Sequence, residues 1–411
     1  MLPRITRVVA GLVTTLVVVH PVPTSADQRV APAALDEPTF LRRVAERSPR
    51  RQVFDDRRRL ATASIGVASV LPNPTLAYER EAVPGLDAHD DFVRLAFPVD
   101  VAGRRGLSAA AARAGADAEH ATVERDAFVV QLEARLAYLD AAYARQLLAR
   151  LDESRIALAA IADALRSRAA QGDASSYDAE RAALELEALD DERASARRVL
   201  EVARLRLGGL VGEPATPHDA ADAITLPARP PEGALVPVRP EVDAALARGR
   251  QAERERTAAR RRWIPRLDVV AGMLSSASSD GQGIGYIVGI GGDLPLFDRG
   301  GASAARSRAE AKRWQSEARA LALEAAAESE QARRELALRV EQAEAYAAGP
   351  AKRALDLQRR ATLAYREGDR PILELLDVHR GARQASVRAL ELVYEARRAD
   401  LHLRRALGRD R

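Results

Sequence analysis

The sequence predicts a mainly α-helical chain with a small β part, in which one unit of two strands and long antiparallel helices is used twice. The 411 residues are 47% hydrophobic but only 4% aromatic, and 30% are charged. With apolar residues at helical spacing, this composition indicates long packed helices rather than a mixed globular core. Landmarks of the first half recur after about 200 residues, which is far too long for a solenoid repeat and indicates a duplicated half-molecule.

The recurring landmarks are a strand end, a break between two helices and a helix end. We expect the first repeat to cover residues 27–240 and the second to cover residues 241–411. The corresponding positions are Pro98 and Pro295, Gly172-Asp173 and Gly368-Asp369, and Leu207-Gly208 and Leu407-Gly408.

The N-terminus has the parts of a secretory signal peptide. Arg4 and Arg7 precede an apolar run at 8–19, and the small residues Thr24 and Ala26 follow it. We therefore expect residues 1–26 to be a cleaved signal peptide, with no lipid anchor because no cysteine follows. The apolar run is shorter than the roughly 20 residues of a membrane-spanning helix. No other segment is long and apolar enough, so an exported chain of this kind would cross a membrane by strands.

The first repeat is predicted to contain a helix, two strands and two further helices. The N-terminal helix covers about 36–70, and the strands cover 75–81 and 91–101, the second with alternating apolar residues. Helices follow at 103–170 and 173–207, separated by a Gly-Asp break. The Pro- and Gly-rich stretch 208–240 is predicted to be an irregular equatorial linker.

The second repeat is predicted to follow the same order. A helix at 241–262 precedes strands at 267–276 and 284–296 and helices at 300–367 and 370–407. The helix 103–170 would be on the order of 100 Å long, more than a globular core needs. The shorter helices reach this length if 173–207 is continued by 241–262 and 370–407 by 36–70. These lengths predict a cylinder of helical segments of equal total length, with the strands at one end and the Gly-Asp breaks at the other.

The strands predict an oligomer. Their length and single apolar face suit a membrane β-barrel. Four strands cannot close, because single-chain barrels begin at eight, and open edges are not tolerated in lipid. Three copies would supply twelve strands, so a homotrimer is the simplest closure. The alternative is a soluble hairpin that caps a coiled coil.

No pattern of an enzyme, a cofactor or a metal site emerges. The glycine-rich run 281–292 has a strand pattern and ends in Asp-Leu-Pro rather than a helix, which argues against phosphate binding. The basic runs 57–59 and 260–262 lie on charged helices with balanced signs, which favours solvated faces or lipid-headgroup contacts over nucleic acid. The histidines of the mature chain lack metal-ligand spacing: His89, His120, His218, His379 and His402.

Two repeated segments resemble the strand-to-helix junctions of the outer membrane factor family, the TolC-like efflux and secretion ducts. They are residues 99–105 (VDVAGRR) and 294–300 (LPLFDRG). Residues 71–79 (LPNPTLAYE) are similar to a segment of the heavy-metal, CzcC-like branch of this family. The resemblance covers nearly the whole mature chain. It implies a homotrimer with a twelve-stranded barrel in the Gram-negative outer membrane and a helical tunnel across the periplasm, opened by an inner-membrane pump and a periplasmic adaptor.

The resemblance also implies a gate at the tip of the tunnel. The family's gate positions correspond to Asp178, Tyr365 and Arg370, where the tyrosine and the arginine bond to the acid. Acidic residues that face the pore correspond to Glu374 and Asp377, which would form two carboxylate rings that favour cations. The helix-tip turns expected to contact the adaptor are Gly172, Asp173, Gly368 and Asp369.

The function that follows is a passive exit duct of a tripartite efflux system, with divalent heavy-metal cations as the cargo. The same duct would serve drugs, small organic molecules or type I protein secretion, because such ducts take what their pump delivers. A different class, a non-channel periplasmic coiled-coil or adaptor protein, remains as the alternative. An adaptor normally has one helical hairpin and compact β domains rather than two strand-pair units.

Overall fold

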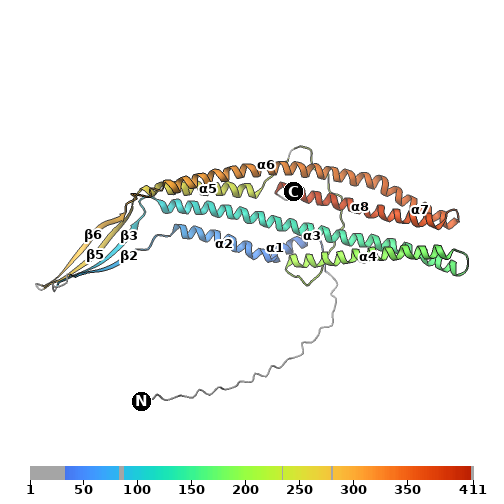
Figure 1. Cartoon of the computed structure of the whole chain (residues 1–411), viewed down its shortest axis with the longest axis horizontal. Helices are drawn as coiled ribbons and strands as arrows, with labels where there is room; N and C mark the ends of the chain where they lie inside the picture. The colour runs from blue at the N-terminus through green and yellow to red at the C-terminus, as the bar shows by residue number, and fades with distance from the viewer. Residues whose placement is uncertain (1–32, 83–87, 234, 279–280, 409–411) are drawn as a thin grey trace, which may run out of the picture.

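The computed structural model describes residues 33–82, 88–233, 235–278 and 281–408. These residues form an elongated molecule with a four-stranded sheet at one end and two helix turns at the other (Figure 1). Long helices run between the two ends. The prediction of a mainly helical chain with a small sheet is confirmed. The predicted signal peptide, residues 1–26, lies outside the described residues.

The sheet is antiparallel, with the strand order β2-β3-β5-β6. The strands are β2 (Thr75–Ala82), β3 (His89–Val99), β5 (Arg266–Ser278) and β6 (Gly281–Asp293). Each strand pair precedes a long helix, α3 (Arg104–Ala170) after β3 and α6 (Gly301–Tyr346) after β6. The strands begin or end within a few residues of the predicted bounds.

One face of the sheet is a continuous apolar surface. Residues that are paired across antiparallel strands point to the same face, and Tyr78, Val93, Met273 and Tyr286 form one such row across all four strands. Tyr286 is 87% exposed. We call this surface the apolar sheet face; it consists of Leu76, Tyr78, Val93, Leu95, Phe97, Val99, Leu267, Val269, Met273, Ile284, Tyr286, Val288 and Ile290.

The helices form a curved layer along the molecule. The first repeat contributes α1 (Glu37–Arg47), α2 (Pro49–Ser69), α3 and α4 (Ser176–Val211). The second contributes α5 (Pro240–Arg260), α6, α7 (Lys352–Glu367) and α8 (Ile372–Leu407). No helix in the described ranges is long and apolar enough to cross a membrane.

Two helices that were predicted as continuous are interrupted. The N-terminal helix divides at Ser48, because Pro49 starts a new helix there and the Ser48 hydroxyl accepts a hydrogen bond from the backbone N–H of Arg50. The helix predicted over 300–367 contains a π-helical turn at Ala347–Ala351. Pro350 lies inside this turn; it has no N–H to donate, and a π-turn accommodates the lost hydrogen bond.

The predicted end-to-end pairing of the shorter helices is wrong. Helix α5 adjoins the end of α8, where the backbone N–H of Val238 donates to the carbonyl of Leu407 at 2.9 Å. Helices α1 and α2 adjoin the end of α4, where Arg47 and Glu213 form an ion pair at 3.2 Å. Both α5 and α8 pack between α3 and α6, whereas α2 and α4 share the other side of α3. The linker therefore crosses from one side of α3 to the other. Helix lengths alone do not predict this crossing.

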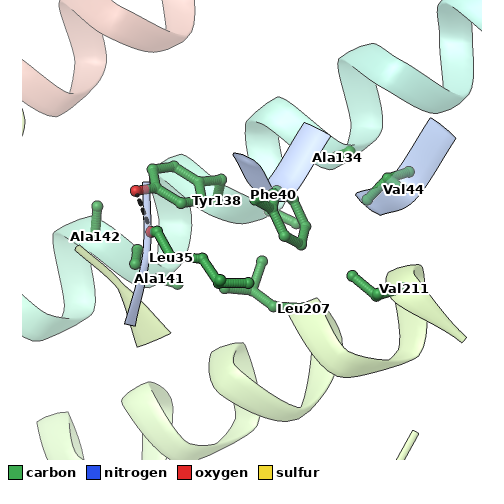
Figure 2. Close-up of a cluster of buried hydrophobic side chains, with 11 residues drawn as sticks. Leu35, Phe40, Val44, Ala134, Tyr138, Ala141, Ala142, Leu207 and Val211 are labelled. Atoms are coloured by element: carbon green, nitrogen blue, oxygen red, sulfur yellow. Dashed lines mark hydrogen bonds between the residues drawn. The ribbon is translucent and has the colours of Figure 1, made fainter. Parts of the chain in front are cut away.

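The middle of the molecule has a compact core where the chain changes direction. The stretch predicted as an irregular linker, 208–240, includes the last turn of α4 and the strand β4 (His218–Ala220), which pairs in parallel with β1 (Ala33–Leu35). Phe40 and Leu207 pack against Tyr138, and the Tyr138 hydroxyl donates to the Leu35 carbonyl at 2.8 Å (Figure 2). The same hydroxyl lies 2.8 Å from Oδ2 of Asp222. Burial raises the pKa of Tyr138, which therefore stays neutral and holds these segments by hydrogen bonds.

Candidate functional site at the helix-turn end

Both helix hairpins turn by the same device. Helix α3 ends at Ala170, Gly172 adopts the left-handed conformation with φ 82°, and the N–H of Asp173 donates to the carbonyl of Arg168 at 2.8 Å. In the second hairpin Gly368 has φ 83°, and the N–H of Asp369 donates to the carbonyl of Ala364 at 2.9 Å. These are glycine C-caps, in which a side chain at the glycine would be strained.

A hydrophobic cluster joins the two hairpins behind their turns. Leu165 of α3, Ala182 of α4 and Leu375 of α8 are buried in it. The ring of Tyr365, on α7, packs against the same cluster. The structure therefore brings α3, α4, α7 and α8 together at one end and places the predicted gate residues on or beside these helices.

The predicted gate bonds are not formed within a single chain. Among the described residues, Asp178 makes no hydrogen bond or ion pair with Tyr365 or Arg370. The Arg370 guanidinium instead pairs with Glu374 at 3.1 Å, one helical turn further on. Both side chains are at least half exposed. The gate assignment stays a prediction that concerns the assembled channel.

The two predicted pore carboxylates each have an arginine partner three or four residues away in the sequence. Glu374 pairs with Arg370, and Oδ1 of Asp377 lies 3.2 Å from Nη1 of Arg380. Exposed pairs of this kind contribute little to stability, typically about 0–1 kcal/mol. They do offset negative charge locally, so the net negative charge around Glu374 and Asp377 is smaller than the two carboxylates alone would give.

A charge network between α4 and α8 was missed by the sequence analysis. The Arg380 guanidinium makes two hydrogen bonds to the carboxylate of Glu185, at 3.0 and 2.5 Å, and the Glu185 side chain is only 16% exposed. Hydrogen bonding to Arg380 lowers the pKa of Glu185. Arg383 lies 3.8 Å from Glu185 and 3.7 Å from Glu192. One signal was available, because Glu185 and Arg380 follow the two Gly-Asp breaks at similar distances.

A second polar contact, at His379, links α7 to α8. Its ring nitrogens lie 3.0 Å from Nε2 of Gln358 and 3.4 Å from the Thr362 hydroxyl. Burial lowers the pKa of His379, so the imidazole is neutral at pH 7. The sequence analysis assigned His379 no role. Its place facing α7 depends on the register of the hairpin.

At the opposite end, the first strand-to-helix junction is hydrogen-bonded to the segment that connects α5 to β5. Asp100 accepts hydrogen bonds from the backbone N–H groups of Arg104 and Arg105 at 2.9 and 2.8 Å, which caps α3. Asp298 accepts one from the N–H of Gly300 at 2.8 Å. The Arg104 side chain bonds backbone carbonyls between α5 and β5, and Arg261 returns a bond to the carbonyl of Ala102 at 2.9 Å.

Among the residues that the structure describes, no group of three or more potential ligands could hold a metal ion.

The second half of the chain matches a known protein family. Residues 237–409 match the family described as "Outer membrane efflux protein". The second half of the chain therefore resembles the outer membrane efflux protein family. Proteins of this family are passive channels of the Gram-negative outer membrane rather than enzymes, which agrees with the predicted lack of enzymatic activity.

Solved structures of outer membrane channels share the fold of this chain over nearly its whole length. The outer-membrane channel OprN superposes with a TM-score of 0.73 at 19% identity, over 91% of this chain and 90% of OprN. VceC from Vibrio cholerae gives 0.71 at 17% identity, over 90% and 96% of the two chains. CusC gives 0.70 at 17% identity, over 92% and 94%. A comparison with curated protein sequences finds no match.

Proposed function

We propose that this protein is the outer-membrane channel of a tripartite efflux system, a passive exit duct that works with an inner-membrane pump and a periplasmic adaptor. The family match of residues 237–409 and the fold shared with channels such as OprN support this proposal. The observation that carries it is the apolar sheet face. Large apolar side chains such as Ile284, Tyr286 and Ile290 are more than three-quarters exposed in the single chain. Only lipid or another protein would remove this surface from water.

We propose that three copies close the sheet. The strand order leaves β2 and β6 as edges, each with unpaired backbone groups along one side. Lipid cannot satisfy such groups, so β6 of one copy would pair with β2 of the next. Three copies give a twelve-stranded barrel, the size predicted from the sequence.

The helices offer a matching lateral contact. Val53, Leu60 and Val67 recur on α2 at seven-residue spacing and are 52%, 70% and 78% exposed. Leu323 and Leu338 are similarly exposed on α6, on the other edge of the helical layer. Seven-residue apolar spacing is the pattern of a packing seam between helices. The α2 edge of one copy would pack on the α6 edge of the next and extend the barrel as a helical tunnel.

In this assembly the helix-turn end is the periplasmic entrance. Asp178, Tyr365 and Arg370 would close the gate, and the turns at Gly172-Asp173 and Gly368-Asp369 would meet the adaptor. Their presence at one end of the molecule, around one hydrophobic cluster, supports this proposal.

For the cargo we propose divalent heavy-metal cations, on the similarity of residues 71–79 to the heavy-metal branch. Drugs, other small organic molecules and secreted proteins are the competing cargoes. Deletion of the gene with measurement of metal and drug sensitivity in the same strain separates them. Sensitivity to drugs with normal metal tolerance would contradict the metal assignment.

The channel itself is tested with the purified full-length chain. We expect it to be extracted from the outer membrane by detergent as a trimer and to conduct ions in planar lipid bilayers. A soluble periplasmic monomer without conductance would support the adaptor or coiled-coil alternative and would refute the channel.

A further inference from the structure

A pocket of about 230 Å³ lies where the apolar sheet face meets the helices. Its apolar wall consists of Val70 and Leu71, which precede β2, Val99 and Val101 around the end of β3, and Leu267 of β5. Val99 and Leu267 are paired across β3 and β5, so they form the last row of the apolar sheet face. The pocket therefore continues that face toward the helical end of the sheet.

Three arginines line the same pocket: Arg104, Arg105 and Arg266. The Arg104 side chain is bound to backbone carbonyls at the junction. The exposed side chain of Arg105 has no hydrogen bond or ion pair with any other described residue. Arg266 is held loosely, 3.6 Å from Asp293, and both of these side chains are more than 70% exposed.

The carboxylate that lines the pocket already accepts hydrogen bonds from the backbone. Asp100 also lines it, but its two carboxylate oxygens accept the backbone N–H groups of Arg104 and Arg105. The rim is therefore positively charged while the wall is apolar. A ligand that matches both needs an apolar chain joined to an anionic head.

We propose that this pocket binds an anionic phospholipid from the membrane leaflet on the side of the helices. An acyl chain would lie against Leu71, Val99 and Leu267, and the phosphate would be held by Arg105 and Arg266. Guanidinium groups form strong, paired hydrogen bonds with phosphate oxygens. The proposal rests on the proposed membrane location of the sheet.

Two other occupants fit less well. A free phosphate ion would gain nothing from the apolar wall. A second copy of the chain would pair with the edge strands β2 and β6, whereas Val99 and Leu267 lie on the inner strands β3 and β5. The wall of the pocket thus stays available to lipid when the sheet closes.

Lipid retention by the full-length protein tests the proposal. The protein is incubated in detergent with equal amounts of dioleoyl phosphatidylglycerol and dioleoyl phosphatidylcholine, and bound lipid is measured by native mass spectrometry. We expect a preference for phosphatidylglycerol. Each arginine near an anionic lipid surface contributes about a fivefold preference, so Arg105→Gln and Arg266→Gln together should remove most of it.

The matched control is Arg197→Gln with Arg198→Gln, which removes the same charge from exposed positions of α4, far from the sheet. It should leave the preference unchanged. Leu71→Gln, which keeps every charge, should lower phosphatidylglycerol retention because it disturbs only the apolar wall. An excess of glycerol 3-phosphate, the head without chains, should not displace the lipid.

Several results would overturn the lipid site. They are equal retention of the two lipids by the unaltered protein, loss of the preference in the α4 control, or displacement by glycerol 3-phosphate, which would indicate a simple anion site. Loss of the trimer with lipid retention intact in the double variant would make the pocket a contact between copies. Conductance is measured separately in phosphatidylcholine bilayers. A conducting protein without lipid preference refutes this proposal alone, whereas a non-conducting one refutes the channel.

Discussion

The two helix hairpins end in the same glycine turn but are anchored differently. The last part of α3 buries Leu151, Leu158 and Leu165. By contrast, none of the side chains of α7, all of which are described, is buried. Helix α3 also runs without interruption for 67 residues, whereas a π-helical turn separates α7 from α6. The two hairpins therefore share the same turn but differ in how many apolar side chains are buried next to it.

This difference indicates which hairpin moves more easily. Local opening costs least where few apolar side chains are buried. Helix α7 is held to α8 largely by partly buried and polar contacts, including those of His379. The residues that the resemblance assigns to the gate, Tyr365 and Arg370, lie on this less firmly anchored hairpin or in its turn. The anchored hairpin contributes only Asp178.

The largest expected effect tests the anchoring directly. Leu165→Ala, on α3, should lower the free energy of unfolding by about 2–5 kcal/mol, because it leaves a cavity in the cluster. Leu363→Ala is the matched change on α7, where the side chain is 57% exposed, and should change it by less than about 0.5 kcal/mol. Denaturant unfolding of the purified protein measures both. Equal losses would show that the hairpins are anchored alike.

The next effect concerns the link between α4 and α8. Glu185→Gln should cost about 1–3 kcal/mol, because it leaves the Arg380 guanidinium with Asp377, an exposed residue, as its remaining charged partner on α8. Since Arg380 lowers the pKa of Glu185, this stabilisation is present above the ordinary carboxyl pKa of about 4.3 and is lost as the pH falls through the lower folded pKa.

Unfolding measured between pH 3 and pH 7 checks this sign. The stability difference between the unaltered protein and Glu185→Gln should shrink toward the acid end. Asp377→Asn, which breaks only the exposed pair with Arg380, is the control and should have little effect. A constant difference at every pH would contradict the role of the charged pair.

A third prediction concerns the gate. Tyr365→Phe with Arg370→Ser removes two of the predicted ties, each of which contributes roughly 1 kcal/mol in each of three copies. We expect the resting single-channel conductance in planar bilayers to rise. Tyr177→Phe, at an exposed position near the other turn, is the control. Unchanged conductance of the double variant would exclude these residues from the gate.

The smallest expected effect concerns the two predicted pore carboxylates, Glu374 and Asp377. Glu374→Ala with Asp377→Ala should weaken block of the channel by multivalent cations, by a modest factor because Arg370 and Arg380 already offset the two charges. The concentration of multivalent cation that halves the current is the quantity to compare. Block of unaltered strength would place both side chains outside the pore.

The sequence predicted most elements because their signals are local. Alternating apolar residues mark the strands, the glycines at 172 and 368 mark the turns, and the uninterrupted helical pattern marks α3. The π-helical turn was missed although Pro350 was visible in the sequence, because the surrounding pattern is strongly helical. The break at Ser48 was missed for the same reason, although Pro49 follows it directly.

The candidate site was predicted less completely. Its positions came from a resemblance, and the sequence placed them near the two turns, as the structure does. Their contacts could not be predicted, since the pairing of Arg370 with Glu374 competes with the expected bond to Asp178. The network around Glu185 requires the register between α4 and α8, which residues far apart in the chain determine.

The sequence by itself determined the elements, the two turns and the apolar face of the strands, because each follows from the chemistry of neighbouring residues. Only the tertiary structure decided that α5 continues α8 and that α2 continues α4. It also decided that β3 pairs with β5, which joins the two strand pairs in one sheet and extends their apolar face to the arginines of the junction. Such choices depend on contacts between distant segments, and helix length and periodicity are the same for either arrangement.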